Sequence, residues 1–313
     1  MGSFFYDARG RLRAGWRLLV FIALLFALWT IFGAPLSALL AGLEALEPDS
    51  ESAPRPETNR LMLYLDGYLL LPLLLASWLM VRYVDRRPFA SLGFALQADV
   101  KRELLQGLAL GFGMGLAFLF LGLLSGVVRL DPQASPRLDE LILVLIGFAL
   151  AALFEETLFH GYLFQTTIEG IGVYPALFLI SVVFSLFHRA NPGVTLPGLI
   201  NIALASLLLA LGYLKTRALW LPVTAHFSWN AFLVLCGFRV SGLNFGPGLL
   251  EPELHGAEAL TGGAFGPEGS LITTVVFGGT IAFVYLSRAI RARPEMAALW
   301  REHLRPAFGK MEF

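Results

Sequence analysis

The sequence predicts an all-α integral membrane protein, a polytopic bundle of about eight transmembrane helices. Apolar residues make up 57% of the 313 positions and charged residues only 15%, and the mean hydropathy is +0.70. Ordinary soluble domains are closer to half apolar and a quarter charged. The apolar residues also gather in stretches long enough to cross ~30 Å of hydrocarbon. The formal net charge is zero, so no overall basic field points to a nucleic-acid partner.

Each apolar stretch is expected to be a helix, because lipid offers the backbone no hydrogen-bond partners. The alternation with period two that a β-barrel would show is absent. The first stretch is too long for a signal peptide and reads as a retained anchor. The whole chain, 1–313, is expected to form one membrane domain. The expected spans are residues 16–40, 61–81, 104–128, 141–168, 173–188, 196–214, 219–237 and 271–286.

The distribution of charge predicts the orientation of the chain. With eight spans, most of the 23 Lys and Arg residues fall in the segments on one side, and acidic residues gather in the loops on the other. The positive-inside rule then places both termini in the cytoplasm of a multi-pass cell-membrane protein. Residues 44–60 and the Gly- and Pro-rich residues 241–270 are expected to be outer loops, the second either flexible or a lid over a cavity. Residues 294–310 are expected to form an amphipathic helix on the inner leaflet.

Polar residues inside the apolar stretches carry the chemical signal, because a charge at the bilayer centre costs at least ~2.5 kcal/mol. Asp66 lies near the outer end of its span and is expected at the membrane interface. Glu155 and Glu156 are adjacent and deep in the fourth span, where a purely structural role as a helix clamp is the alternative. A desolvated carboxylate beside a second one is suited to general acid/base chemistry.

Three of the five histidines lie in or at the end of apolar spans in the same half of the chain. His226 and Asn230 are four residues apart, so they share one face of a helix, and Glu156 and His160 have the same spacing. At ~1.5 Å of rise per residue, Glu155 and His188 are expected to lie at the same height along two antiparallel helices. We therefore expect these side chains to converge on one site.

The motifs Glu155-Glu156-x-x-x-His160-Gly161, Phe184-x-x-x-His188 and His226-x-x-x-Asn230 resemble the three signature motifs of the CPBP family. This group of CAAX proteases and bacteriocin-processing proteins includes the Ras-converting CAAX endopeptidase. The resemblance is to the catalytic core, residues 141–237, and three motifs in the right order are a specific signal. One position departs from the family pattern, since the family's first motif usually ends in Arg where this chain has His160.

The resemblance implies an intramembrane endopeptidase that hydrolyses a peptide bond of a membrane-associated peptide or protein. Glu155 would take a proton from water, and His188 would help to hold that water. His226 and Asn230 would stabilise the oxyanion, a role for which fixed donors are effective in a low-dielectric site. Glu156 would tune Glu155, with Phe184 and His160 in supporting positions.

Zinc is the alternative way to activate the water, which would make the protein a metalloprotease. The ligands would then be Glu155, His188 and His226, and the cofactor is either none or Zn²⁺. His160 would brace the carboxylates in place of the family Arg, or would reach the site as an additional ligand. No His-Glu-x-x-His motif is present, and the single Cys236 lies in an apolar run that argues against a catalytic thiol.

Two other classes of function remain open on the sequence. A catalytically silent relative could serve as a membrane scaffold or regulator, and it could tolerate His160 in place of Arg. A proton-coupled transporter could also use buried carboxylates and histidines. Against transport, the sequence has no internal repeat of the kind from which many transporters are built.

Overall fold

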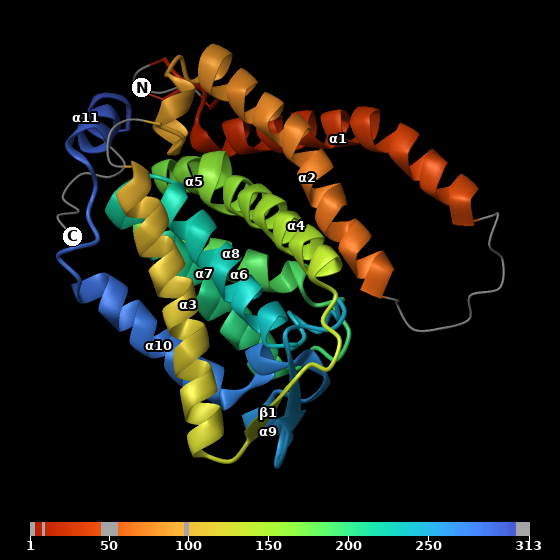
Figure 1. The fold of residues 1–313 in the computed structure, drawn as a ribbon. Coiled ribbons are helices and arrows are strands. Elements are labelled where there is room, and N and C mark those ends of the chain that lie inside the picture. The colour runs from red at the N-terminus through yellow and green to blue at the C-terminus, as the bar shows by residue number, and fades with distance from the viewer. Residues whose placement is uncertain (1–3, 8–9, 45–55, 97–99, 305–313) are drawn as a thin grey trace.

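The computed structural model describes residues 4–7, 10–44, 56–96 and 100–304. In these residues the chain is a helical bundle with a small two-stranded sheet at one end (Figure 1). A helix lies in each of the eight predicted apolar stretches. These helices are α1 (Ala14–Glu44), α2 (Pro56–Leu79), α3 (Val100–Leu124), α4 (Leu138–Glu156) continued by α5 (Leu163–Ile171), α6 (Val173–Phe187), α7 (Leu196–Thr216), α8 (Trp220–Leu235) and α10 (Leu271–Leu286).

Five stretches are long and apolar enough to cross a membrane, namely 14–35, 58–84, 100–124, 138–171 and 196–216. Helices α6 and α10 are apolar but have only 15 and 16 residues, and α8 has 16. Crossing by all eight helices therefore stays a prediction. The start of α1 and the C-terminal helix α11 (Pro294–His303) lie at the same end of the molecule (Figure 1), and the cytoplasmic placement of that end also stays a prediction.

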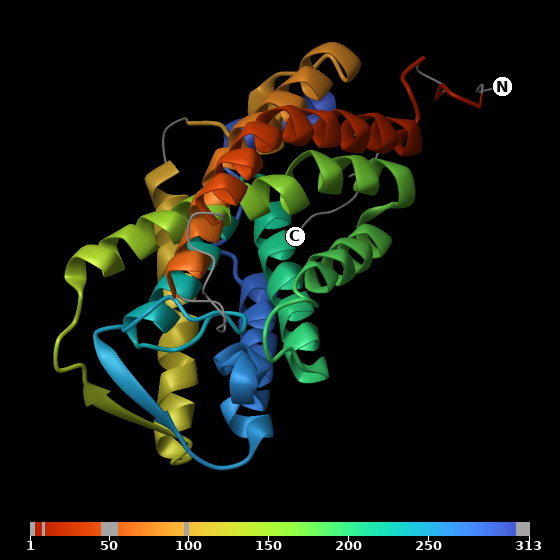
Figure 2. The same ribbon diagram turned by 90° about the vertical axis from the view of Figure 1, so that its right-hand side faces the viewer.

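Helices α1 and α2 lie across one side of the bundle (Figures 1 and 2), with α2 against α4 and α1 against α2 and α5. A buried ion-pair network fixes α1 at its first turn. Arg17 donates to Asp85 at 2.9 Å and to Glu169 at 2.6 Å. Asp85 follows the π-helical turn η1 (Met80–Val84) and also pairs with Arg87. Because breaking one partner of a buried pair leaves an uncompensated charge, the network holds the ends of α1, η1 and α5 together.

Helix α3 packs along α8, the helix that carries two of the predicted site residues. Gly107, Gly111 and Gly115 face α8, and a Cβ at any of them would overlap atoms of that helix. Ser228 of α8 donates a hydrogen bond to the carbonyl oxygen of Gly107 at 3.3 Å. Small residues at every fourth position of α3 thus allow the two helices to approach closely within the bundle.

The Gly- and Pro-rich residues 241–270 are not a free loop. They contain β2 (Leu250–Leu254), α9 (Glu258–Thr261) and the 3₁₀ turns η4 (Gly263–Phe265) and η5 (Pro267–Gly269). Strand β2 pairs antiparallel with β1 (Val128–Pro132), from Val128 opposite Leu254 to Pro132 opposite Leu250. Asn201 of α7 donates to the carbonyl oxygens of Glu268 and Ser270 at 2.8 Å. The expectation of a flexible loop is wrong, because strand pairing and a buried amide fix a segment that has no apolar period.

Two further expectations concern segments that the structure describes only in part. Most of the expected outer loop at 44–60 lies outside the described residues, and α2 already begins at Pro56. The expected amphipathic helix is α11, and residues 305–310 lie outside the described chain. Its apolar residues Met296 and Trp300, with Leu304 after it, are buried rather than free for a membrane surface. Trp300 packs on Tyr213 and lies under the guanidinium of Arg217, near the 3₁₀ turn η2 (Phe89–Leu92).

We predict that Gly111→Ala destabilises the protein, since its methyl group would overlap the Ser228 hydroxyl and the Ala225 carbonyl oxygen. Overpacking of this kind costs about 1–3 kcal/mol. Thermal unfolding of purified protein in detergent measures the effect. Gly113→Ala on the same helix is the matched control, because a Cβ there meets no atom within 4 Å. Equal midpoints for the two variants would contradict the packing described here.

Candidate active site

The Glu pair lies where the fourth predicted span changes its helical geometry. Helix α4 ends at Glu156, and a π-helical turn, η3 (Thr157–Tyr162), leads into α5. Gly161 leaves helical geometry there, at φ −83° and ψ −120°. Turns of this kind inside helices are frequent at functional sites. Since successive helical residues point ~100° apart, Glu155 faces a cavity while Glu156 points into the protein and is fully buried.

The buried carboxylate of Glu156 accepts hydrogen bonds at both oxygens. His160, one turn later, donates from Nδ1 to Oε2 at 2.6 Å. His226 on α8 donates from Nδ1 to Oε1 at 2.9 Å. A buried carboxylate is tolerated only when it is paired and hydrogen-bonded. Glu156 therefore joins two of the three predicted motifs through direct contacts.

His160 lies behind the site rather than in it. It is fully buried, and its ring packs near those of Phe164 and Phe184. With Nδ1 donating to Glu156, the Nε2 atom of the ring faces the Ser206 hydroxyl at 3.4 Å. His160 does not line the cavity, so the geometry matches the expected brace rather than an additional ligand.

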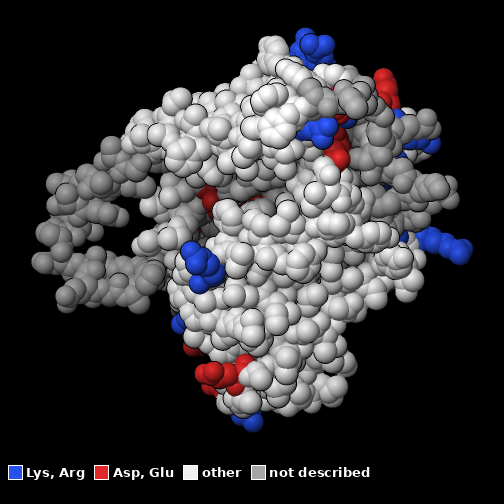
Figure 3. Space-filling view, turned by 180° about the vertical axis from the view of Figure 1, so that it is seen from behind, with Lys and Arg blue, Asp and Glu red and all other residues white. Residues whose placement is uncertain are grey.

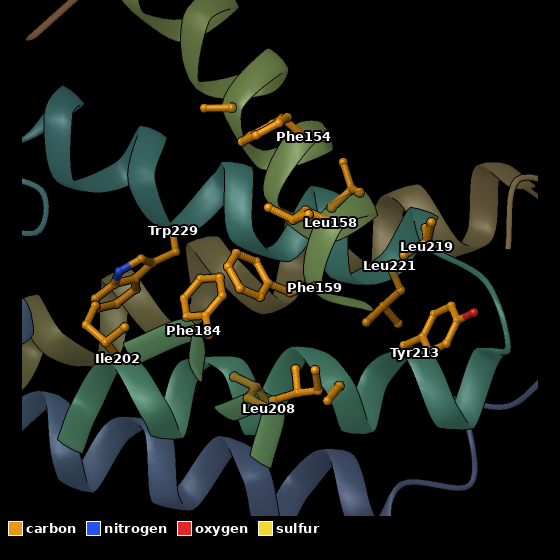
Figure 4. Close-up of a cluster of buried hydrophobic side chains, with 14 of the residues drawn as sticks. Phe154, Leu158, Phe159, Phe184, Ile202, Leu208, Tyr213, Leu219, Leu221 and Trp229 are labelled. Carbon is orange, nitrogen blue, oxygen red and sulfur yellow. The ribbon is translucent and has the colours of Figure 1, made fainter. Parts of the chain in front are cut away.

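The cavity has a volume of about 480 Å³, and Glu155, His188, His226 and Asn230 all line it. The expected convergence of the three motifs is therefore present in the structure. Most of the remaining lining is apolar and aromatic. Phe159 and Phe184 lie side by side, with ring centroids 4.9 Å apart, and Trp229 lies nearby (Figure 4). Figure 3 shows a hollow on a face that carries few charged residues, and atoms of Asp or Glu are visible inside it.

Glu155 and His188 differ in what holds them. His188, at the end of α6, directs Nδ1 to the carbonyl oxygen of Phe184 at 2.9 Å. This bond fixes the ring and leaves Nε2 for the cavity. The Oε2 atom of Glu155 is buried and has no hydrogen-bond partner among the described residues. An unpartnered buried carboxylate oxygen is costly, and it is a ready acceptor for a water or substrate proton.

Two acidic residues line the cavity that were not predicted to be site residues. Asp66, on α2, lines the cavity, and its expected position at the membrane interface stays a prediction. Glu268, from the segment expected to be flexible, accepts from Trp229 Nε1 at 3.2 Å and from the Ser241 hydroxyl at 2.9 Å. The backbone N–H of Ser241 donates to it as well. Hydropathy alone could not show what Asp66 contacts, and Glu268 belongs to no sequence motif.

The residues present do not form a ready zinc site. Among the described residues, no three His, Cys, Asp or Glu side chains are grouped so that they could hold a metal ion. In the expected set, His226 uses Nδ1 on Glu156 and His188 uses Nδ1 on Phe184. Only the Nε2 atoms and Glu155 remain, and they are not gathered around one point.

We predict opposite effects on stability for the two neighbouring carboxylates. Glu156→Gln replaces one accepting oxygen by an amide that faces a histidine N–H, which costs about 1–3 kcal/mol of unfolding free energy. Glu155→Gln removes an unpartnered charge and is expected to leave stability unchanged or to raise it. Unfolding of both variants in detergent compares them directly. A larger loss for Glu155→Gln would contradict the assignment of Glu156 as the residue that holds the site together.

Comparison with known proteins adds an independent finding. Residues 137–232, about a third of the chain, match the family model described as type II CAAX prenyl endopeptidase Rce1-like. No curated protein and no solved structure matched the chain. The matched stretch runs from the start of α4 into α8 and contains all three motifs, from Glu155 to Asn230. The match over residues 137–232 supports the CAAX protease family that the three motifs had predicted.

Proposed function

We propose that the protein is an intramembrane endopeptidase that hydrolyses a peptide bond with a water activated by Glu155. The observation that carries this proposal is the unpartnered Glu155 oxygen in a cavity that is also lined by His188, His226 and Asn230. The family match supports a protease that acts on membrane-associated substrates. The apolar helices fit a multi-pass protein that meets such substrates in the bilayer.

The attacking water is held by two acceptors. His188 donates from Nδ1 to the carbonyl oxygen of Phe184. In the neutral ring, Nε2 is then the nitrogen that accepts a hydrogen bond. A water that donates one hydrogen to Glu155 and one to His188 presents a lone pair to the substrate carbonyl carbon. Glu155 takes one proton as the C–O bond forms, and it gives that proton to the amide nitrogen as the C–N bond breaks. The products are a carboxyl group and an amine.

The oxyanion is stabilised from α8. Asn230 lies one turn after His226 and lines the cavity, so its amide group is available to donate to the oxyanion. His226 donates from Nδ1 to Glu156. The Nε2 atom of His226 can therefore donate to the oxyanion only when both ring nitrogens are protonated. The fully buried Glu156 supplies the countercharge for that form. Glu156 and His160 thus act as positioning residues, one step away from the reacting atoms.

We predict that Glu155→Gln lowers kcat/KM by about 10²–10⁴-fold, the usual contribution of a general base. Purified protein and a library of quenched-fluorescent membrane peptides provide the assay. Glu251→Gln, an exposed residue of β2, is the matched control and is expected to keep full activity. Wild-type activity in Glu155→Gln would contradict the proposed role. No cleavage by folded wild type across the library would instead favour a silent relative.

We also predict that Asn230→Ala lowers kcat by about 10²–10³-fold with little change in KM, as expected for loss of an oxyanion donor. A zinc chelator in the same assay is expected to leave wild-type activity unchanged. If the chelator abolished activity and Zn²⁺ restored it, the nucleophile would be a metal-bound water and not a water activated by Glu155. A change confined to KM would show that Asn230 binds substrate without stabilising the transition state.

A further inference from the structure

The cavity of the proposed active site carries an uneven set of charges. Three carboxylates line it, from Asp66, Glu155 and Glu268. Among the described residues that line the cavity there is no Lys and no Arg. Of the described lining residues, only His188 and His226 are able to carry a positive charge. The cavity is therefore acidic inside an otherwise apolar wall.

Most of these charges already have partners. Any charge on His226 is balanced by Glu156, which lies behind the cavity and bonds its Nδ1. The Oε1 atom of Glu268 accepts from Trp229, and its Oε2 atom accepts from the hydroxyl and the backbone N–H of Ser241. Glu155 and Asp66 are the two lining carboxylates that accept no hydrogen bond from a described residue.

Asp66 stands apart from the known motifs. It lies on α2, outside the stretch that matches the family. Among the described residues, no hydrogen bond or ion pair holds its carboxylate, and its strongest electrostatic neighbour is Glu155. Two like charges in a low-dielectric cavity repel each other. A cation bound in the cavity beside them would relieve that repulsion.

We infer that the substrate is an apolar membrane segment that carries a Lys or Arg side chain close to the cleaved bond, and that Asp66 receives this cation. The inference rests on the proposed function and deepens it. The apolar lining accepts the flanking residues of such a segment, and the acidic cavity disfavours an anionic group at the same place. The catalytic residues then come from the stretch that matches the family, and the preference for a cationic side chain comes from α2.

A peptide series with one variable position tests this inference. Lys, Gln or Glu is placed in turn at each position flanking the cleaved bond of an apolar peptide. Wild type is expected to cleave the best Lys peptide with a kcat/KM about tenfold above that of the Gln peptide, as for one charge-assisted hydrogen bond. In Asp66→Asn that ratio is expected to fall below about twofold, and Asp66→Glu is expected to keep the preference. Asp131→Asn, an exposed residue of β1, is the matched control and keeps the wild-type ratio.

Binding of non-cleavable peptides, with a reduced amide at the scissile bond, separates the inference from the proposed function. If wild type cleaves the series without preference for Lys, the inference is overturned and the protease assignment stands. If wild type cleaves nothing but binds the Lys analogue about tenfold more tightly than the Gln analogue, the protease assignment fails and the cation site stands. An equal Lys-to-Gln ratio in wild type and Asp66→Asn would show that Asp66 does not receive the cation.

Discussion

The site depends on one buried carboxylate that is shared by two histidines. Glu156 has no access to solvent, and each of its oxygens accepts from one ring, His160 on its own helical turn and His226 on α8. Removing either ring would leave part of a charge buried without a partner, which proteins tolerate poorly. The same contacts hold α8 against the π-helical turn, and they fix the plane in which His226 faces the cavity. Small residues of α3 then hold α8 from its other side.

The residue next to Glu156 has the opposite environment. Glu155 lies one position earlier on the same helix, yet its Oε2 atom has no hydrogen-bond partner among the described residues. Helical geometry separates the two, because adjacent residues point in different directions. One carboxylate is thus held by two histidines, and the other faces the cavity. Such a division is expected where an active site gives up local stability for reactivity.

Much of this could be predicted from the sequence, for physical reasons. Apolar stretches placed the helices, and motif spacing identified Glu155, His188 and His226 as neighbours. Sequence spacing could not show that Glu156 turns away from the cavity, because that depends on where the π-helical turn begins. Asp66 was not predicted as a site residue because hydropathy indicates a depth in the membrane but does not identify the neighbours of a side chain. Glu268 was missed because strand pairing and the amide of Asn201, rather than any periodic pattern, hold its segment in place.

A double-mutant cycle tests most directly whether Glu156 joins the two helices. The unfolding free energies of Glu156→Gln, His226→Ala and the double variant are measured in mixed micelles. Glu156→Gln combined with Tyr174→Ala, an exposed residue of α6, serves as the reference cycle. A coupling energy above about 1 kcal/mol between Glu156 and His226, against none in the reference, is the predicted result. Additivity within about 0.5 kcal/mol in both cycles would contradict the account.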